Sequence, residues 1–223
     1  MNRPAPPLRR TGFSLIELLT VLAITAVLAS LGMIAFGNIN RAGGLTRSGS
    51  EVLGLIEQAR SYAMAHSTHV WVGFLPDAQG DLFVTVVASR DGDASPVETD
   101  TTLANADLLQ LGRLTRLSTV RLISAPQGSR PVTTANGQLA NAGSPPFAFR
   151  VKSGSSTLTF SAATGARVIQ INGRGEVLLG QELHPIVEIG LESSAAPLGG
   201  TNSVNYAAIQ IAALSGASQL FRP

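Results

Sequence analysis

The chain has 223 residues, of which 44% are hydrophobic and 13% are charged, and it contains no cysteine. Its length allows one domain of ordinary size with an additional segment. The lack of cysteine excludes a disulfide framework, a thiolate zinc site, an iron–sulfur cluster and a cysteine nucleophile. The 16 Lys and Arg residues outnumber the 14 Asp and Glu residues, and a basic balance can indicate an acidic partner such as nucleic acid or a membrane surface. That inference depends on where the basic residues lie.

The N-terminal end combines a basic leader with a long apolar run. Residues 1–12 contain three arginines and no acidic residue. Residues 13–40 contain one charged residue, Glu17, and the 23 residues from Leu18 to Asn40 are uncharged. As a helix, this uncharged run would extend about 34 Å, which exceeds the roughly 30 Å of a bilayer core. The pattern predicts a membrane-spanning helix whose N-terminus stays in the cytoplasm.

Three kinds of N-terminal segment fit this pattern. A secretory signal could be cut after Val27-Leu28-Ala29, where small residues follow an apolar run. A plain membrane anchor would keep the whole segment. Neither explains Glu17, because an acid near a bilayer core costs about 2.5 kcal/mol or more and usually has a partner there.

The third kind does explain the acid. The string Gly12-Phe13-Ser14-Leu15-Ile16-Glu17 resembles the signal of type IV prepilins. The resemblance implies that a prepilin peptidase cuts after Gly12 and methylates the new N-terminal residue, Phe13. It also implies that Glu17 is the acid of the fifth mature position, on which assembly depends. The partners it implies are the peptidase, other pilin or pseudopilin subunits, an inner-membrane assembly platform and membrane lipid. The residues themselves lead us to expect no cofactor, no metal and no nucleic acid.

Elementary electrostatics gives Glu17 a role in such an assembly. An acid in the first turn of a helix is favoured by the partial positive charge there. Cleavage before Phe13 would create an ammonium group, which Glu17 of a neighbouring subunit could neutralise. Both charges are costly in lipid and cost less as a pair, so the acid would set the register between subunits.

A second helical segment follows the apolar run. Glycines between residues 32 and 44 lower helix stability by about 1 kcal/mol each, so we expect a bend or a melted stretch near residues 37–46. Apolar residues at helical spacing then predict an amphipathic helix over residues 47–66. The predicted stripe consists of Val52, Leu55, Ile56, Ala59, Ala63 and Ala65.

The rest of the chain predicts an antiparallel sheet. Ten runs rich in β-branched and aromatic residues are expected to form strands. They are His69–Leu75, Asp81–Ala88, Thr119–Ser124, Phe147–Lys152, Ser156–Ser161, Arg167–Ile171, Glu176–Leu179, Pro185–Glu192, Tyr206–Ala212 and Ala217–Phe221. Turn residues at 76–80 and 172–175 predict hairpins between their flanking strands. Residues 103–117 predict a short helix, and residues 89–101, 125–146 and 193–204 predict loops.

This layout, an α+β fold with one long N-terminal helix on an antiparallel sheet, is similar to that of pilins and pseudopilins. Residues 57–72 and the closing hairpin around Ser215-Gly216 resemble FimT/GspH-type minor pseudopilins. Major type IV pilins usually close a C-terminal loop with a disulfide, which a chain without cysteine cannot form, so the resemblance favours a minor pilin or a pseudopilin. The implied organisation is a removed leader at 1–12, a membrane and filament-core helix at 13–40 and an exported domain at 41–223.

Two clusters of possible metal ligands give only weak signals of a metal site. His66 and His69 are three residues apart, a spacing that can hold a metal, but the sequence places no third ligand near them. Asp91-Gly92-Asp93, followed by Glu98 and Asp100, could bind calcium, although a solvated acidic turn is the simpler interpretation.

The remaining candidates are basic or aromatic. Arg113 and Arg116 would share a helix face near Arg121, and such patches can bind DNA, but no aromatic residues alternate with them. Trp71 and Phe74 are expected in the core. The sequence contains no catalytic constellation, so we expect no enzyme.

Removal of residues 1–12 would change the charge balance. It takes away three of the 16 basic residues and leaves 13 against 14 acidic residues. The excess of basic residues therefore comes from the leader, and it gives only weak support for a nucleic-acid partner.

The sequence predicts a minor pilin or pseudopilin that is held in the cytoplasmic membrane, with its C-terminal domain outside, and then built into a filament. The alternative is a membrane-tethered β-domain that binds a ligand or DNA.

Overall fold

A computed structural model describes eight stretches of the chain. They are residues 15–78, 80–94, 107–118, 120–124, 137–141, 147–180, 182–194 and 206–222, with the side chains of residues 31–43 left out. The chain divides into two compact units, Met1–Arg41 and Ala42–Pro223.

The helix α1, Leu15–His66, contributes to both units. Its helical assignment continues through residues 37–46, so the melted stretch predicted there is wrong. A glycine costs a helix only about 1 kcal/mol, which good helix formers on either side can offset.

The part of α1 from Ala42 onward packs on the sheets through one stripe. Its buried residues are spaced by three, four and seven positions, as an amphipathic helix requires. They are Leu45, Ser48, Gly49, Val52, Ile56, Ala59 and Ala63. The predicted stripe is thus confirmed in its centre, but Ala65 is exposed and Leu55 is only half-buried, because these two positions lie at the edges of the contact.

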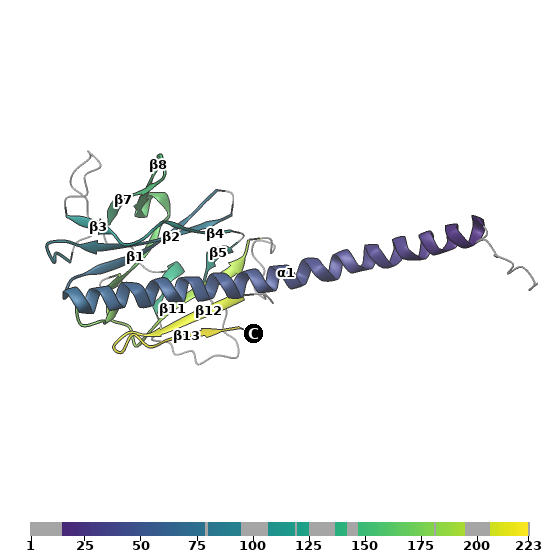
Figure 1. The fold of residues 1–223 in the computed structure, drawn as a ribbon. Coiled ribbons are helices and arrows are strands. Elements are labelled where there is room, and N and C mark those ends of the chain that lie inside the picture. Colours follow the sequence, from purple (N-terminus) through teal and green to yellow (C-terminus); the bar gives the residue numbers. More distant parts are fainter. Residues whose placement is uncertain are drawn as a thin grey trace, which may run out of the picture. The chain divides into compact units, whose positions relative to one another are not determined.

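The strands form two larger sheets and a separate hairpin (Figure 1). The first, called here the β1 sheet, has the order β10-β9-β1-β2-β3, with β4 also pairing β2. Its strands are β1 (Val70–Pro76), β2 (Leu82–Ser89), β3 (Leu108–Gln110), β4 (Thr115–Leu117), β9 (Arg167–Ile171) and β10 (Val177–Leu179). All of its pairs are antiparallel.

Two of the predicted hairpins lie in the β1 sheet. The first joins β1 to β2, with Val70 opposite Ala88 and Pro76 opposite Leu82. The second joins β9 to β10 through the turn at residues 172–175, where the Gly175 N–H donates to the carbonyl of Asn172 at 2.8 Å. The Asn172 side chain holds this turn, since its Oδ1 accepts from the N–H groups of Arg174 and Glu176, both at 3.0 Å.

The second sheet, called here the β11 sheet, has the order β13-β12-β11-β5, with β6 also pairing β11. Its strands are β5 (Val120–Ile123), β6 (Gly137–Gln138), β11 (Ile186–Ser193), β12 (Tyr206–Ala212) and β13 (Ser218–Phe221). The predicted closing hairpin is present as β12 and β13. The pairing of β6 with β11 is parallel, whereas the sequence predicted only antiparallel pairs in a single sheet.

The short helix predicted at residues 103–117 is wrong for the described residues of that range. Residues 108–110 and 115–117 form β3 and β4 instead. Both strands pair with β2, and the Leu111 N–H donates to the carbonyl of Val86 at 2.8 Å. Tertiary pairing with a buried strand here outweighs the helix propensity of leucine.

Part of the loop predicted at 125–146 is also structured. It contains β6 and the 3-10 helix η1, Leu139–Asn141. Of the other two predicted loops, residues 89 and 193 are the last residues of β2 and β11. Residues 95–100 and 195–204 lie outside the described residues.

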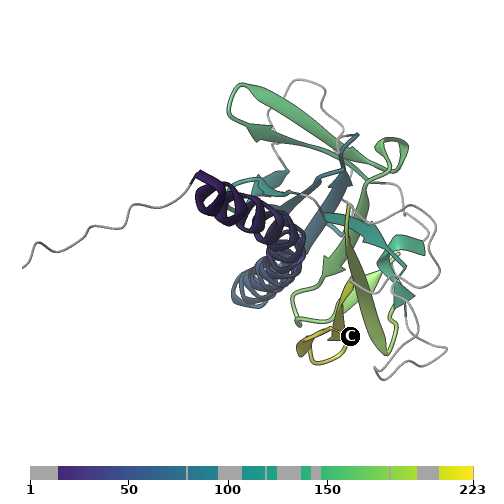
Figure 2. The same ribbon diagram turned by 90° about the vertical axis from the view of Figure 1, so that its right-hand side faces the viewer.

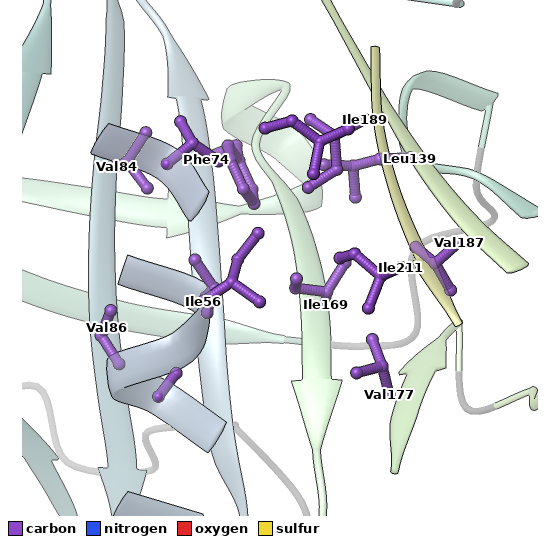
Figure 3. Packing of buried hydrophobic residues seen from close by; sticks show 14 of the residues in the cluster. Ile56, Phe74, Val84, Val86, Leu139, Ile169, Val177, Val187, Ile189 and Ile211 are labelled. Atoms are coloured by element: carbon purple, nitrogen blue, oxygen red, sulfur yellow. The ribbon is translucent and has the colours of Figure 1, made fainter. Parts of the chain in front are cut away.

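The main core consists of side chains from the second half of α1 and from both sheets. Figure 2 views this part of the domain along the helix. Ile56 of α1 packs there with Phe74 and Ile169 of the β1 sheet and with Ile189 and Ile211 of the β11 sheet (Figure 3). The domain is mostly β structure, with a helix packed on antiparallel sheets. This confirms the predicted α+β class in that general form.

A smaller core lies on the opposite face of the β1 sheet. It is covered by the hairpin of β7 (Ala148–Ser153) and β8 (Ser156–Ser161), which continues through the 3-10 helix η2 (Ala162–Thr164) into β9. Gly73 allows this close packing, because a Cβ atom there would lie 2.9 Å from the ring of Phe160 and 3.0 Å from that of Phe149.

Candidate functional site

The candidate site is the first half of α1. Glu17 lies in the first turn of the helix and is exposed. The N–H groups of a first turn have no partners within the helix, and the partial positive charge there favours an acid. Gly12 and Phe13 lie outside the described residues, so their roles in cleavage and methylation stay predictions.

Large apolar side chains are exposed around this part of the helix. Nine of them between residues 15 and 28 are 56–82% accessible. They are Leu15, Ile16, Leu18, Leu19, Val21, Leu22, Ile24, Val27 and Leu28. A helix that is apolar on all sides is normally buried in protein or lipid. A search of the described residues finds no helix with the length and hydropathy of a membrane-crossing segment.

The hydroxyl groups of this segment are satisfied by the helix itself. The Thr20 hydroxyl donates to the carbonyls of Ile16 and Glu17, each at 2.9 Å. Thr25 donates to the carbonyls of Val21 and Leu22, and Ser30 to that of Val27. Hydroxyls bonded in this way need no outside partner, so they add little cost when the helix enters an apolar environment.

The two histidines do not form a metal site with other described residues. His66 ends α1 and stacks on Tyr62 with ring centroids 4.1 Å apart. His69 precedes β1, and its Nδ1 lies 3.0 Å from the carbonyl oxygen of Gly92. Among the described residues, no group of three His, Cys, Asp or Glu side chains is arranged to hold a metal ion.

The acidic turn after β2 is organised by its own hydrogen bonds. The Ser89 hydroxyl donates to Asp91 Oδ1 at 2.7 Å, and the Asp93 N–H donates to the same oxygen at 3.0 Å. These bonds, with that from Ser89 the stronger cause, lower the pKa of Asp91. Glu98 and Asp100 lie outside the described residues.

Arg113 and Arg116 do not share a helix face as predicted, because the strands β3 and β4 take the place of that helix. Arg116 on β4 pairs with Asp81 at 2.6 Å. Arg121 on β5 pairs with Glu192 at 2.6 Å. Arg113 is exposed in the turn between β3 and β4. Two of the three charges are therefore paired with carboxylates, Asp81 directly before β2 and Glu192 on β11.

Trp71 and Phe74 are core residues, as predicted, and they face opposite sides of β1. Phe74 lies in the main core and Trp71 in the smaller one. The alternation of residues along a strand explains the difference, because an odd number of steps separates them.

A buried carboxylate escaped the sequence analysis. Glu188 on β11 is fully buried. Its two oxygens accept from the side-chain amides of Gln138 at 2.8 Å and Gln210 at 2.5 Å. The alternation in residues 186–193 places Glu188 and Glu192 on one face of the strand, and that pattern was a signal of polar contacts on this face.

Comparisons with known proteins bear on the N-terminal segment. A search of curated proteins finds no match, and a search of solved structures finds none. The family model described as the prokaryotic N-terminal methylation motif matches residues 8–33. These residues include Gly12, Phe13 and Glu17 and the start of α1. The match supports a pilin- or pseudopilin-type subunit of the type IV pilin-like family, and it does not distinguish the FimT/GspH group.

Proposed function

We propose that this chain is a minor pilin or pseudopilin, a structural subunit of a type IV pilus or of a type II secretion pseudopilus. A prepilin peptidase cuts it between Gly12 and Phe13 and methylates the Phe13 amine. The observation that carries the proposal is the methylation motif at residues 8–33, which coincides with a helix whose apolar side chains are exposed.

Burial of the exposed apolar side chains drives this helix to bind lipid first and other subunits afterwards. Burying a large aliphatic side chain contributes about 1.5–3 kcal/mol. Nine such side chains that are more than half exposed thus correspond to on the order of 10 kcal/mol. The run from Leu18 to Asn40 contains no charged residue, and as a helix it is long enough to cross a bilayer core.

Glu17 sets the register between neighbouring helices. Cleavage creates an ammonium group at Phe13, four residues before Glu17 in the sequence, and a carboxylate from one subunit neutralises the ammonium of the next. An unpaired charge among apolar helices costs several kcal/mol. The stack is therefore favoured only at the axial offset that brings the two groups together.

The basic leader determines the location of the subunit. The three arginines in residues 1–12 outnumber the single Arg41 at the end of the apolar run, and this excess favours an N-terminus in the cytoplasm and a domain outside it. The subunit is therefore held in the cytoplasmic membrane by residues 13–40, and it meets the peptidase and the assembly platform there. Residues 41–223 form the exported domain. The lack of cysteine favours a minor pilin or pseudopilin over a major pilin.

The test is incorporation of Glu17 variants into filaments. Glu17→Gln removes the charge and keeps nearly the same volume. We expect it to lower the amount of subunit in sheared or purified filaments at least tenfold, with the membrane-bound amount and the cleavage unchanged. Equal incorporation of Glu17→Gln and the unchanged chain would refute the registry role.

A matched control is Glu51→Gln, since Glu51 is an exposed acid on the second half of the same helix. It should leave incorporation unchanged. Loss of incorporation in both variants would mean that any loss of negative charge on α1 acts in the same way, which contradicts a specific pair at Glu17.

A further inference from the structure

The β7–β8 hairpin is attached to the rest of the domain by side chains. It forms a two-stranded sheet of its own. Among the described residues, no backbone hydrogen bond joins either of its strands to the β1 sheet. The buried side chains of its strands, Phe149, Val151 and Phe160, pack in the smaller core with Trp71 and Val168, and Leu158 packs against that core. An isolated two-stranded hairpin is at best marginally stable, so this packing keeps it in place.

Two buried polar atoms beneath the hairpin have no hydrogen-bond partner among the residues that the structure describes. They are the indole Nε1 of Trp71 and the hydroxyl oxygen of Thr85. Each residue is only 1% exposed. Trp71 pairs with Val87 and Thr85 with Gly73, so the two side chains are diagonal neighbours on the same face of the sheet. That face is the one that the hairpin covers, because Trp71 and Val87 belong to the smaller core.

Closing the hairpin over the sheet therefore has a free-energy cost at the Trp71 indole N–H and the Thr85 hydroxyl. A buried donor or hydroxyl without a partner loses its bonds to water and gains none in return. When the hairpin lifts, water reaches both groups and restores those bonds. The apolar packing of the aromatic rings favours closure, and the two polar groups oppose it.

We propose that the β7–β8 hairpin is a flap that opens while the β1 sheet stays intact, and that Trp71 and Thr85 promote this opening. The C-terminal hinge lies between Ser161 and Ala166. Ser161 caps η2 at one end, and Gly165 ends it in the left-handed conformation at φ 75°. Beyond the hinge, β9 is fixed by its pairing with β1. The open flap exposes an aromatic surface of Trp71, Phe149 and Phe160, with the indole N–H and the Thr85 hydroxyl beside it.

Hydrogen exchange at Trp71 separates this motion from opening of the sheet. The sequence has a single tryptophan, so the full chain labelled with ¹⁵N-tryptophan in detergent micelles gives one indole signal and one backbone amide signal. The backbone of Trp71 lies between β2 and β9, so its amide exchanges only when the sheet opens. The indole N–H exchanges when the flap alone opens. After division by the intrinsic rates, we expect the indole to exchange at least tenfold faster than the amide.

Two variants of Thr85 test the role of the unsatisfied hydroxyl. Thr85→Val keeps the shape and removes the hydroxyl, so the closed flap gains stability and the indole N–H should exchange about tenfold more slowly than in the unchanged chain. Thr85→Ser keeps the hydroxyl and should not slow the indole. Equal exchange of the indole and the amide in the unchanged chain would overturn the flap. Indole exchange in Thr85→Val that is unchanged or faster would mean that the hydroxyl is satisfied in the closed state, for example by a bound water, and would overturn the role of Thr85 in opening.

Discussion

The turn between β12 and β13 allows a sharp test of how α1 is joined to the β11 sheet. Gly216 has a φ of 66°, in the left-handed region that disfavours residues with a Cβ atom. A Cβ atom at this position would overlap Nε and Cδ of Arg60 on α1. Arg60 in turn donates from Nε to the carbonyl of Gly175 at 3.3 Å. Gly216→Ala therefore changes the backbone energy of the turn and also displaces the arginine.

Two terms add up in this variant. An alanine in the left-handed conformation costs about 1–2 kcal/mol. Displacing Arg60 loses a hydrogen bond to a neutral carbonyl, which contributes about 0.5–1.5 kcal/mol. We expect the free energy of unfolding to fall by about 2–3 kcal/mol, measured by urea denaturation of the full chain in detergent and followed by the fluorescence of Trp71.

Gly154→Ala is the matched control. Gly154, in the turn of the β7–β8 hairpin, also has a positive φ, of 60°, and a Cβ atom there would meet no atom within 4 Å. This variant should lose only the backbone term of about 1–2 kcal/mol. In an Arg60→Ala background, Gly216→Ala should cost no more than Gly154→Ala. Equal losses for the two glycine variants in the unchanged background would refute the proposed contact with Arg60.

Three further variants test separate parts of the domain. Glu188→Ala removes the carboxylate that accepts from the amides of buried Gln210 and half-buried Gln138; since losing such bonds in a buried site costs about 1–3 kcal/mol, denaturation should show a loss in that range, and a loss below about 1 kcal/mol would contradict the contribution of this cluster. Asn172→Ala removes the side chain that accepts two backbone N–H groups in the β9–β10 turn, and we expect a loss of about 1–2 kcal/mol, whereas an unchanged midpoint would show that the turn forms without it. The pKa of Asp91 is lowered in the folded chain, so its contribution to stability is present at neutral pH and is lost as the pH falls through the folded pKa. An NMR titration should show this carboxyl titrating below an ordinary aspartate, and Ser89→Ala should move its pKa back upward.

Much of the fold was predictable because its signals are local. The strands β1, β2, β9 and β11 are rich in β-branched residues, and each predicted hairpin has a turn with hydrogen bonds among its own residues. Asn172 is an example, since its side chain bonds to the N–H groups of the same turn. Such features depend on neighbours in the sequence and not on the rest of the fold.

The features that were missed depend on distant partners. The alternation along a strand indicates which side chains are buried, but not which sheet the strand joins, so the division into two sheets was not predictable. The two-residue strand β6 has no periodic pattern and is defined only by its pairing with β11. The leucines at residues 108–117 favoured a helix, and their pairing with β2 decided otherwise.

The candidate site rests on the same kind of local signal as the hairpins. Glycine, phenylalanine and an acid at fixed spacing before an apolar run form a linear pattern, and the family model for the N-terminal methylation motif matches it at residues 8–33. The bonds from Thr20, Thr25 and Ser30 to carbonyls of their own helix add a physical reason why that run can be buried on every side.

Determination of the mature N-terminus tests the central proposal most directly. The full chain is expressed with a prepilin peptidase, purified from membranes and analysed by mass spectrometry of its N-terminal peptide. We expect a chain that begins at Phe13 and carries one methyl group on its amine. A chain that begins at Ser30 would indicate an ordinary secretory signal, and an intact residue 1 would indicate a simple anchor. Either result would contradict the proposal.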